Sequence, residues 1–163
     1  MGQREEEFER LALPQSPHLL RFALRLTQNR PLAEDLVQET LLLAWRGFPK
    51  FEPGSNVRAW LFRILINALY SQNRKGRTAP PLLALRSDVR SAEGSLSDAF
   101  EVTQALDRLP SDQRTALLLA VVEGFTCREI AEILAVPIGT VMSRLSRARE
   151  AMREALAPAK VSR

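Results

Sequence analysis

Residues that start helices recur along the first half of this chain, and they constrain its fold more than any other feature. Ser16-Pro17 predicts a helix, because serine caps a helix N-terminus and proline suits its first turn. Asn29-Arg30-Pro31 repeats the pattern, and Asn56 can cap a third helix. Residues 47–55 hold two prolines and two glycines and are therefore predicted to form a loop. The predicted helices cover residues 16–28, 29–46 and 56–75.

The second half of the chain begins with a change of composition. Residues 77–97 contain Pro80-Pro81 and scattered serines without a sustained period, which predicts a linker. Beyond it, Asp98 and Glu101 have capping-box spacing and predict a helix, and Pro110-Ser111 predicts another. No segment reads persuasively as a strand. We therefore predict an all-α chain of two small helical domains, with an N-terminal helical bundle over residues 1–76, a flexible linker over 77–97 and a C-terminal helix-turn-helix domain over 98–163.

Composition limits the kinds of site that the chain can hold. It has one cysteine and one histidine, so neither an internal disulfide nor a Cys/His metal cage can form. The longest apolar run, residues 116–122, is too short to cross a bilayer, and the acidic N-terminus lacks the apolar stretch of a signal peptide. We expect a cytoplasmic protein with no cofactor, no metal and no membrane insertion. The formal charge of +4 tolerates a nucleic-acid partner without proving one.

The strongest local motif covers residues 126–156. Thr126 and Glu129 form a capping box that opens a short helix. A tight connection ending at Pro137 leads into a longer basic helix, whose apolar residues recur with the helical period. A short capped helix, a tight turn and a basic second helix predict a helix-turn-helix. The predicted buried stripe of the second helix is Val141, Leu145, Ala148 and Met152.

Opposite that stripe lies a face suited to the floor of a DNA major groove. At about 100° per residue, this face carries Met142, Ser143, Ser146 and Arg147. Arg147 is the best candidate for reading a base, because a guanidinium pairs with guanine through two hydrogen bonds. The alternative is a solvated face whose arginines are balanced by nearby glutamates. The flanks, where phosphates would run, carry Thr140, Arg144 and Arg149.

Two further patterns lie in the N-terminal half. Asp35, Gln38 and Glu39 share one face of the second predicted helix, and this acidic patch is either a solvated surface or a docking site for a protein. The third predicted helix mixes aromatic side chains with arginine and asparagine, which suits unpaired bases. Its aromatic residues also fit a packed core, so both interpretations stay open. The candidates on this helix are Arg58, Trp60, Arg63, Asn67, Tyr70, Asn73, Arg74 and Lys75.

With these motifs in place, the chain resembles the extracytoplasmic-function (group IV) sigma factors of bacteria over nearly its full length. Residues 34–40, Glu-Asp-Leu-Val-Gln-Glu-Thr, resemble the family's core-binding signature. Residues 56–67 resemble its promoter-melting segment. Leu109-Pro110, residues 124–131 and residues 139–149 resemble its fourth region.

The resemblance implies a role for each surface. The patch at Asp35, Gln38 and Glu39 would meet the β′ clamp helices of RNA polymerase core, whose β subunit is the other expected contact. Promoter DNA and an anti-sigma factor are the further partners that it implies. The second helix of the helix-turn-helix would read the minus-thirty-five element. The residues implied at the minus-ten element are Phe51, Ser55 and Asn56 of a base-accepting loop, and Arg58, Trp60, Arg63 and Asn67 near the melted strand.

Other functions fit the sequence less well. A helix-turn-helix regulator of the response-regulator kind would need a sensing domain, and residues 1–75 show no βαβ pattern. A sigma mimic that only sequesters an anti-sigma factor would be expected to lose the groove-facing arginines, which are present. An enzyme is the weakest alternative. His18 is read as a packing or surface residue, and Cys127 has no neighbour that suggests nucleophilic chemistry.

Overall fold

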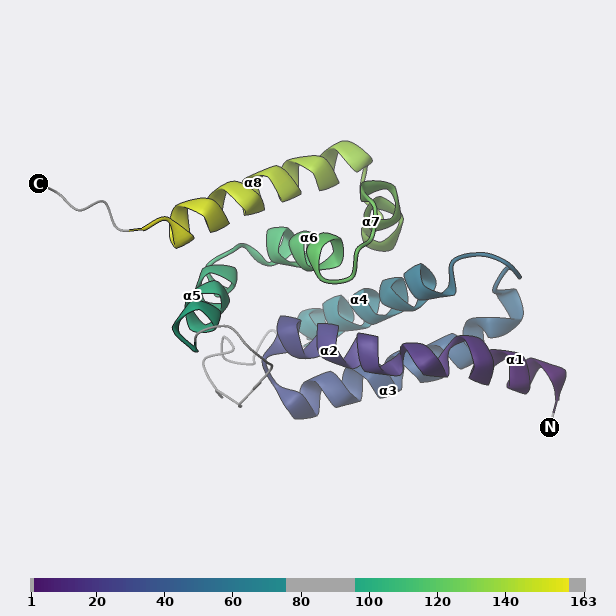
Figure 1. Cartoon of the computed structure of the whole chain (residues 1–163). Coiled ribbons are helices and arrows are strands. Elements are labelled where there is room, and N and C mark those ends of the chain that lie inside the picture. Colours follow the sequence, from purple (N-terminus) through teal and green to yellow (C-terminus); the bar gives the residue numbers. More distant parts are fainter. Residues whose placement is uncertain (1, 76–95, 159–163) are drawn as a thin grey trace, which may run out of the picture. The chain divides into compact units, whose positions relative to one another are not determined.

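The computed structural model describes residues 2–75 and 96–158, and every regular element within them is helical (Figure 1). Helices α1 to α4 belong to one compact unit, and α5, α6, α8 and most of α7 belong to a second. The all-α class predicted from the sequence is confirmed. The predicted linker lies almost entirely outside the described residues. No helix in the described ranges is long and apolar enough to cross a membrane.

The N-terminal unit contains the three predicted helices and one that was not predicted. Asn29 and Asn56 act as the predicted caps: each side-chain Oδ1 accepts from the backbone N–H three residues later, at 3.0 Å in both cases. The unpredicted helix α1 has only Phe8 buried, and most of its residues are charged. The elements are α1 Gln3–Leu11, a 3₁₀ turn Leu13–Gln15, α2 Ser16–Thr27, α3 Arg30–Gly47, a 3₁₀ turn Phe48–Lys50 and α4 Val57–Lys75.

The core of this unit lies between α2, α3 and α4. Phe22 of α2 and Phe62 of α4 meet edge to face with ring centroids 5.1 Å apart, and both are fully buried. Two threonines of this unit are also buried, and their hydroxyl groups are hydrogen-bonded. Thr27 donates its hydroxyl to the Ala23 carbonyl, and Thr40 donates to that of Leu36. The large buried aliphatic side chains are Leu19, Leu36, Leu61, Leu65 and Ile66.

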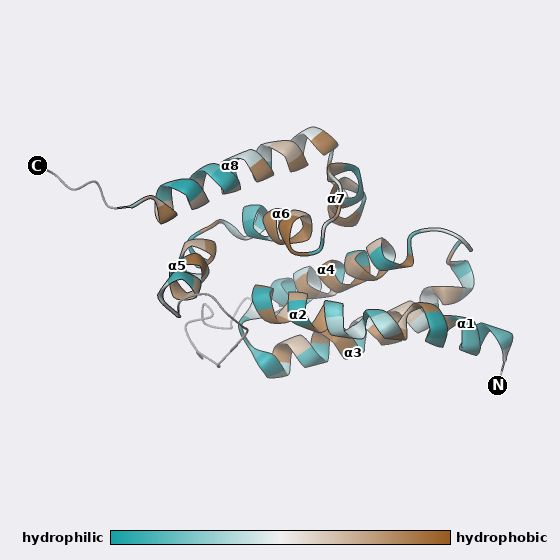
Figure 2. Cartoon of the chain, viewed as in Figure 1, coloured by the Kyte–Doolittle hydropathy of each residue, from teal (hydrophilic) through white to brown (hydrophobic). Residues whose placement is uncertain are grey.

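The C-terminal unit is assembled around α6, whose buried residues lie on several sides. Figure 2 shows the later part of α6 as strongly hydrophobic, whereas α8 carries mostly hydrophilic residues toward its C-terminal end. α6 and α8 pack against each other. The elements are α5 Leu96–Asp107, α6 Ser111–Val121, α7 Cys127–Leu134 and α8 Ile138–Leu156.

The start of α5 differs from the prediction. The helix begins at Leu96, so Asp98 lies in its first turn and does not cap it, and the predicted capping box at Asp98 and Glu101 is wrong. An aspartate is favoured throughout the first helical turn, where it faces the unpaired N–H groups and the positive end of the helix dipole. The same residue therefore suits either position, and its presence alone did not fix the boundary.

Candidate nucleic-acid and protein interfaces

The capping box at the start of the helix-turn-helix is formed as predicted. The Thr126 backbone N–H donates to Glu129 Oε2 at 2.8 Å, and the Glu129 backbone N–H donates to Thr126 Oγ1 at 3.2 Å. The turn after α7 is tight because Ala135 adopts a left-handed φ of 53°. Pro137 is then the N-cap residue of α8. Together these features fix how the two helices of the motif join.

Helix α8 divides into a buried and an exposed face as the periodicity predicts. Val141, Leu145 and Ala148 are almost inaccessible to solvent, and Met152 is half-buried. The opposite side stands free of the unit's core, so its side chains are available to a partner. The exposed residues of that side are Met142, Ser143, Ser146 and Arg147, with Met142 keeping 58% of its surface exposed.

The three predicted flanking residues differ in how much of each side chain is exposed to solvent. Arg149 is exposed, and Thr140 is half-buried. Arg144 forms an ion pair with Asp112 of α6, with Arg144 Nε 3.3 Å from Asp112 Oδ2, and only 24% of the arginine side chain is exposed. This pair links α8 to α6 within the same unit. Local sequence patterns do not indicate this pair, because the two residues lie on different helices.

The acidic patch on α3 is present, and its three residues differ in their exposure to solvent. Asp35 and Gln38 are exposed, whereas Glu39 is half-buried. Glu39 Oε2 accepts a hydrogen bond of 2.9 Å from Nε2 of Gln72 on α4. One edge of the patch is therefore held in place by the neighbouring helix.

Exposed apolar side chains continue the α3 surface beyond the acidic patch. Leu42, Leu43 and Trp45 keep 49%, 39% and 40% of their surface exposed. Because residues four apart share a helix face, Leu42 lies next to Gln38 and Leu43 next to Glu39. These residues were not predicted to be part of the surface. Their signal is present in the run of five apolar residues at 41–45, which is wider than one buried helix face can hold.

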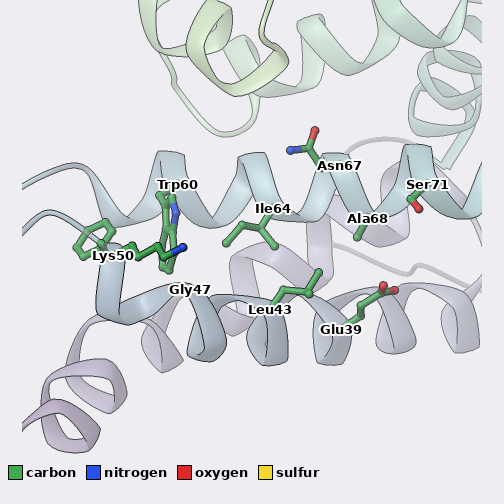
Figure 3. A pocket seen from close by; sticks show the side chains of 10 residues that line it. Glu39, Leu43, Gly47, Lys50, Trp60, Ile64, Asn67, Ala68 and Ser71 are labelled. Atoms are coloured by element: carbon green, nitrogen blue, oxygen red, sulfur yellow. The ribbon is translucent and has the colours of Figure 1, made fainter.

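An open groove runs between α3 and α4 in the N-terminal unit. Figure 3 shows Glu39 and Leu43 on α3, facing Ile64, Ala68 and Ser71 on α4. Gly47 lies at the end of the groove near Trp60, where an added Cβ would stand 3.5 Å from Trp60 Cζ2, an ordinary contact distance. The groove is lined by Glu39, Leu43, Gly47, Lys50, Phe51, Trp60, Ile64, Asn67, Ala68 and Ser71.

The loop between α3 and α4 is held by a few local contacts. Ser55 Oγ donates to the Glu52 carbonyl at 2.6 Å, and Asn56 caps α4. Gly54 adopts a φ of 82°, a left-handed conformation that favours glycine. Phe51 is half-buried against Trp60, with ring centroids 4.7 Å apart. The loop thus joins an internally bonded tip to an aromatic base.

The candidate residues on α4 fall into two groups. Trp60 and Arg58 are half-buried, and the Arg58 guanidinium lies over the Phe62 ring at 5.6 Å from its centroid. Arg63 and Asn67 are exposed. Asn67 also borders a shallow depression further along α4 that is lined by Tyr70, Asn73 and Arg74. The structure therefore leaves Arg63 and Asn67 more accessible to a ligand than Trp60.

Comparison with known proteins shows two family matches. Residues 14–78 match the model for sigma-70 region 2, and residues 99–152 match the model for sigma-70 region 4. The ECF RNA polymerase sigma factor EcfG of Rhodopseudomonas palustris is 40% identical over 146 residues, which cover 82% of this chain and 76% of the relative. The RNA polymerase sigma-H factor of Pseudomonas aeruginosa is 34% identical over 167 residues, covering 93% and 86%.

A solved structure agrees with these matches. The sigma factor RpoE of Bartonella quintana, crystallised with the anti-sigma factor NepR, is similar to this chain with a TM-score of 0.80 and 37% sequence identity. The similarity covers 97% of this chain and 99% of that protein.

Proposed function

The chain belongs to the extracytoplasmic-function sigma factors of bacteria, which direct RNA polymerase to promoters, and on that premise we propose how its surfaces divide the work. The C-terminal unit binds the minus-thirty-five element, and the N-terminal unit binds polymerase and the minus-ten element. The protein acts without catalytic chemistry of its own and in the cytoplasm. The main support for this proposal is the exposed face of α8, which stands opposite the buried residues Val141, Leu145 and Ala148.

The minus-thirty-five element is read by α8 in the major groove. Met142, Ser143, Ser146 and Arg147 face the base edges, because they point away from the core of the unit. Thr140 and Arg149 lie on the flanks and contact phosphates, which position the helix without reading sequence. Arg144 is already paired with Asp112, so its contact with phosphate is shared with that carboxylate.

The minus-ten element is held by the loop and by α4. Residues Phe51, Ser55 and Asn56 surround the position of a flipped base, and hydrogen bonds of Ser55 and Asn56 shape the tip of the loop and its junction with α4. Arg63 and Asn67 meet the separated strand on the exposed side of α4. Arg58 and Trp60 lie next to this surface and are less accessible to the strand, since both are half-buried.

Polymerase core docks on α3. The exposed pair Asp35 and Gln38 supplies hydrogen-bond acceptors and charge, and the adjoining Leu42 supplies apolar area. Such a mixture of an apolar patch with a polar rim is typical of protein interfaces. We assign this surface, with Glu39, to the β′ clamp helices, and the C-terminal unit to the β subunit.

Control by an anti-sigma factor follows from similarity to a solved complex. The sigma factor of Bartonella quintana, which is 37% identical, is held there by the anti-sigma factor NepR. A protein of the same kind would keep this chain from polymerase and DNA until a signal releases it.

Contacts from two units on one chain add by effective concentration, so each contact can be weak alone.

Run-off transcription tests the proposal. Purified core polymerase is assayed with and without this protein on a library of candidate promoters. Starts that depend on the protein, at sites sharing two spaced elements, support it. Core binding without any start would instead indicate a mimic that sequesters an anti-sigma factor, and failure to bind core would contradict the proposed role of α3.

A further inference from the structure

A continuous series of aromatic rings connects the N-terminal helix α1 to the loop between α3 and α4. Phe8 of α1 meets Phe48 edge to face, with centroids 5.2 Å apart and planes at 81°. Phe48 stacks on Phe51 at 5.7 Å and 9°, and Phe51 contacts Trp60 at 4.7 Å. Phe8 also meets Trp45 of α3 edge to face at 5.2 Å. Four segments of the chain therefore meet in one cluster of rings.

Burial shows which rings anchor the series. Phe8 and Phe48 are each 6% exposed, whereas Phe51 and Trp60 are half-buried. Phe8 is the buried residue of α1, and the helix otherwise presents charged side chains such as Glu6 and Glu9 to solvent. The helix is thus fastened to the unit chiefly through the ring that touches Phe48.

The loop depends on these rings for its position. Its tip is closed by the Ser55–Glu52 hydrogen bond, and its C-terminal end is fixed at the start of α4 by the Asn56 cap, so the rings position the other end of the loop. Its base is Phe51, held between Phe48 and Trp60. Removing the ring at position 8 leaves one edge of Phe48 without its partner, and Phe48 can then tilt and carry Phe51 with it.

We propose that Phe8 is a positioning residue for promoter recognition, through which α1 holds the base-accepting loop in its binding conformation. This inference rests on the proposed role of the loop at the minus-ten element. Helix α1 lies outside residues 14–78, the part of the chain that matches the region 2 model, so the family match assigns it no role. Phe8 acts through Phe48 and Phe51 and does not itself touch DNA.

A second aromatic pair in the same unit provides a matched control. Phe22 and Phe62 meet at 5.1 Å and 71°, almost the geometry of Phe8 and Trp45 at 5.2 Å and 71°. Phe22 is at least as buried as Phe8 but makes no ring contact with the described loop residues. Phe22→Leu should therefore cost stability without moving the loop.

The first test measures binding of holoenzyme to a labelled single-stranded oligonucleotide that carries the minus-ten element found by run-off transcription. We expect Phe8→Leu to weaken binding roughly three- to tenfold, the fold-change that corresponds to loss of the Phe8–Phe48 pair, the one of its two ring pairs that leads to the loop. Phe8→Tyr, which keeps the ring, should bind like the wild type, and Phe22→Leu should change binding by less than about twofold. Core polymerase affinity should stay unchanged in all three. Equal losses in Phe8→Leu and Phe22→Leu would overturn the inference, because they would show a general loss of stability.

The second test needs no DNA. The chain has two tryptophans, so Trp45→Phe leaves Trp60 as the sole tryptophan emitter. In that background, Phe8→Leu should increase acrylamide quenching of Trp60, which Phe8 reaches through Phe48 and Phe51, and Phe22→Leu should not. Unchanged quenching in Phe8→Leu would overturn the inference. If wild-type holoenzyme fails to bind the oligonucleotide, the proposed function of the loop fails, and the quenching still decides whether α1 orders the loop.

Discussion

Replacing Arg147 with alanine should remove sequence discrimination at one base pair of the minus-thirty-five element. Arg147 is exposed on the face of α8 that stands opposite the buried residues Val141, Leu145 and Ala148. Among the described residues no ion pair engages its guanidinium, in contrast to Arg144. The substitution therefore deletes a side chain that the fold itself does not use.

The magnitude follows from the chemistry of the contact. A guanidinium that makes two hydrogen bonds to a guanine contributes about 1–3 kcal/mol of discrimination, or roughly 5- to 150-fold in affinity. Free energy of unfolding should be almost unchanged, because an exposed substitution away from caps and core costs less than about 0.5 kcal/mol. A loss of DNA affinity at constant stability is the expected signature of Arg147→Ala.

Two other arginines on α8 serve as internal controls. Arg149→Ala should weaken binding to all sequences alike and reduce the slope of log affinity against log salt by about one. Arg144→Ala should also lower stability, by up to about 1 kcal/mol for a partly exposed ion pair, and Asp112→Ala should lower it further, because its carboxylate also accepts from the Gln113 backbone N–H. The three positions thus separate base reading, phosphate contact and helix positioning.

The assay is fluorescence anisotropy of holoenzyme on a panel of promoters in which each base pair of the element is replaced in turn, at one salt concentration. The wild-type protein should bind more weakly when the guanine that Arg147 contacts is replaced. The affinity of Arg147→Ala should not depend on which base pair stands at that position. A uniform loss of affinity over the whole panel would show that Arg147 contacts a phosphate and reads no base.

Three further predictions concern the other surfaces and the helix caps. Asp35→Ala should weaken binding of the full chain to core polymerase in a pull-down titration while promoter contacts of α8 are retained, and equal losses in both assays would contradict the assignment. Asn56→Ala should cost about 1 kcal/mol in urea unfolding, since it removes the acceptor of the Ala59 N–H, and a loss under a few tenths would count against the cap. Thr126→Ala should lower the free energy of unfolding by about 1 kcal/mol in the same measurement, because the Glu129 N–H loses its acceptor. An unchanged urea midpoint would show that this cap does not stabilise the protein.

Local patterns predicted most of the helices because caps and prolines act within a few residues of their own position. Asn29, Asn56 and Thr126 each bond to a backbone N–H three residues later, so the signal and its effect lie in the same turn. The buried stripe of α8 followed from periodicity for a similar reason. Helix α1 escaped prediction because a single buried ring, Phe8, holds it in place.

Contacts between helices could not be predicted in this way. The Arg144–Asp112 pair and the Glu39–Gln72 hydrogen bond each join residues that lie about thirty positions apart, and only the packing of the helices brings them together. Both contacts change the interpretation of a candidate residue, since Arg144 and Glu39 are partly engaged within the protein. The start of α5 was missed for a different reason, because Asp98 suits a first turn as well as a cap.

If the two helical units bind two different promoter elements, photo-cross-linking of the open complex will place them on separate stretches of DNA. Benzoylphenylalanine is placed at Ser146 on α8 or at Glu52 in the loop, both of which are exposed. Holoenzyme carrying one or the other is irradiated on promoter DNA, and the cross-linked bases are mapped. We predict cross-links from position 146 at the minus-thirty-five element and from position 52 at the minus-ten element. Cross-links from both positions to the same element, or from position 146 to none, would contradict the division.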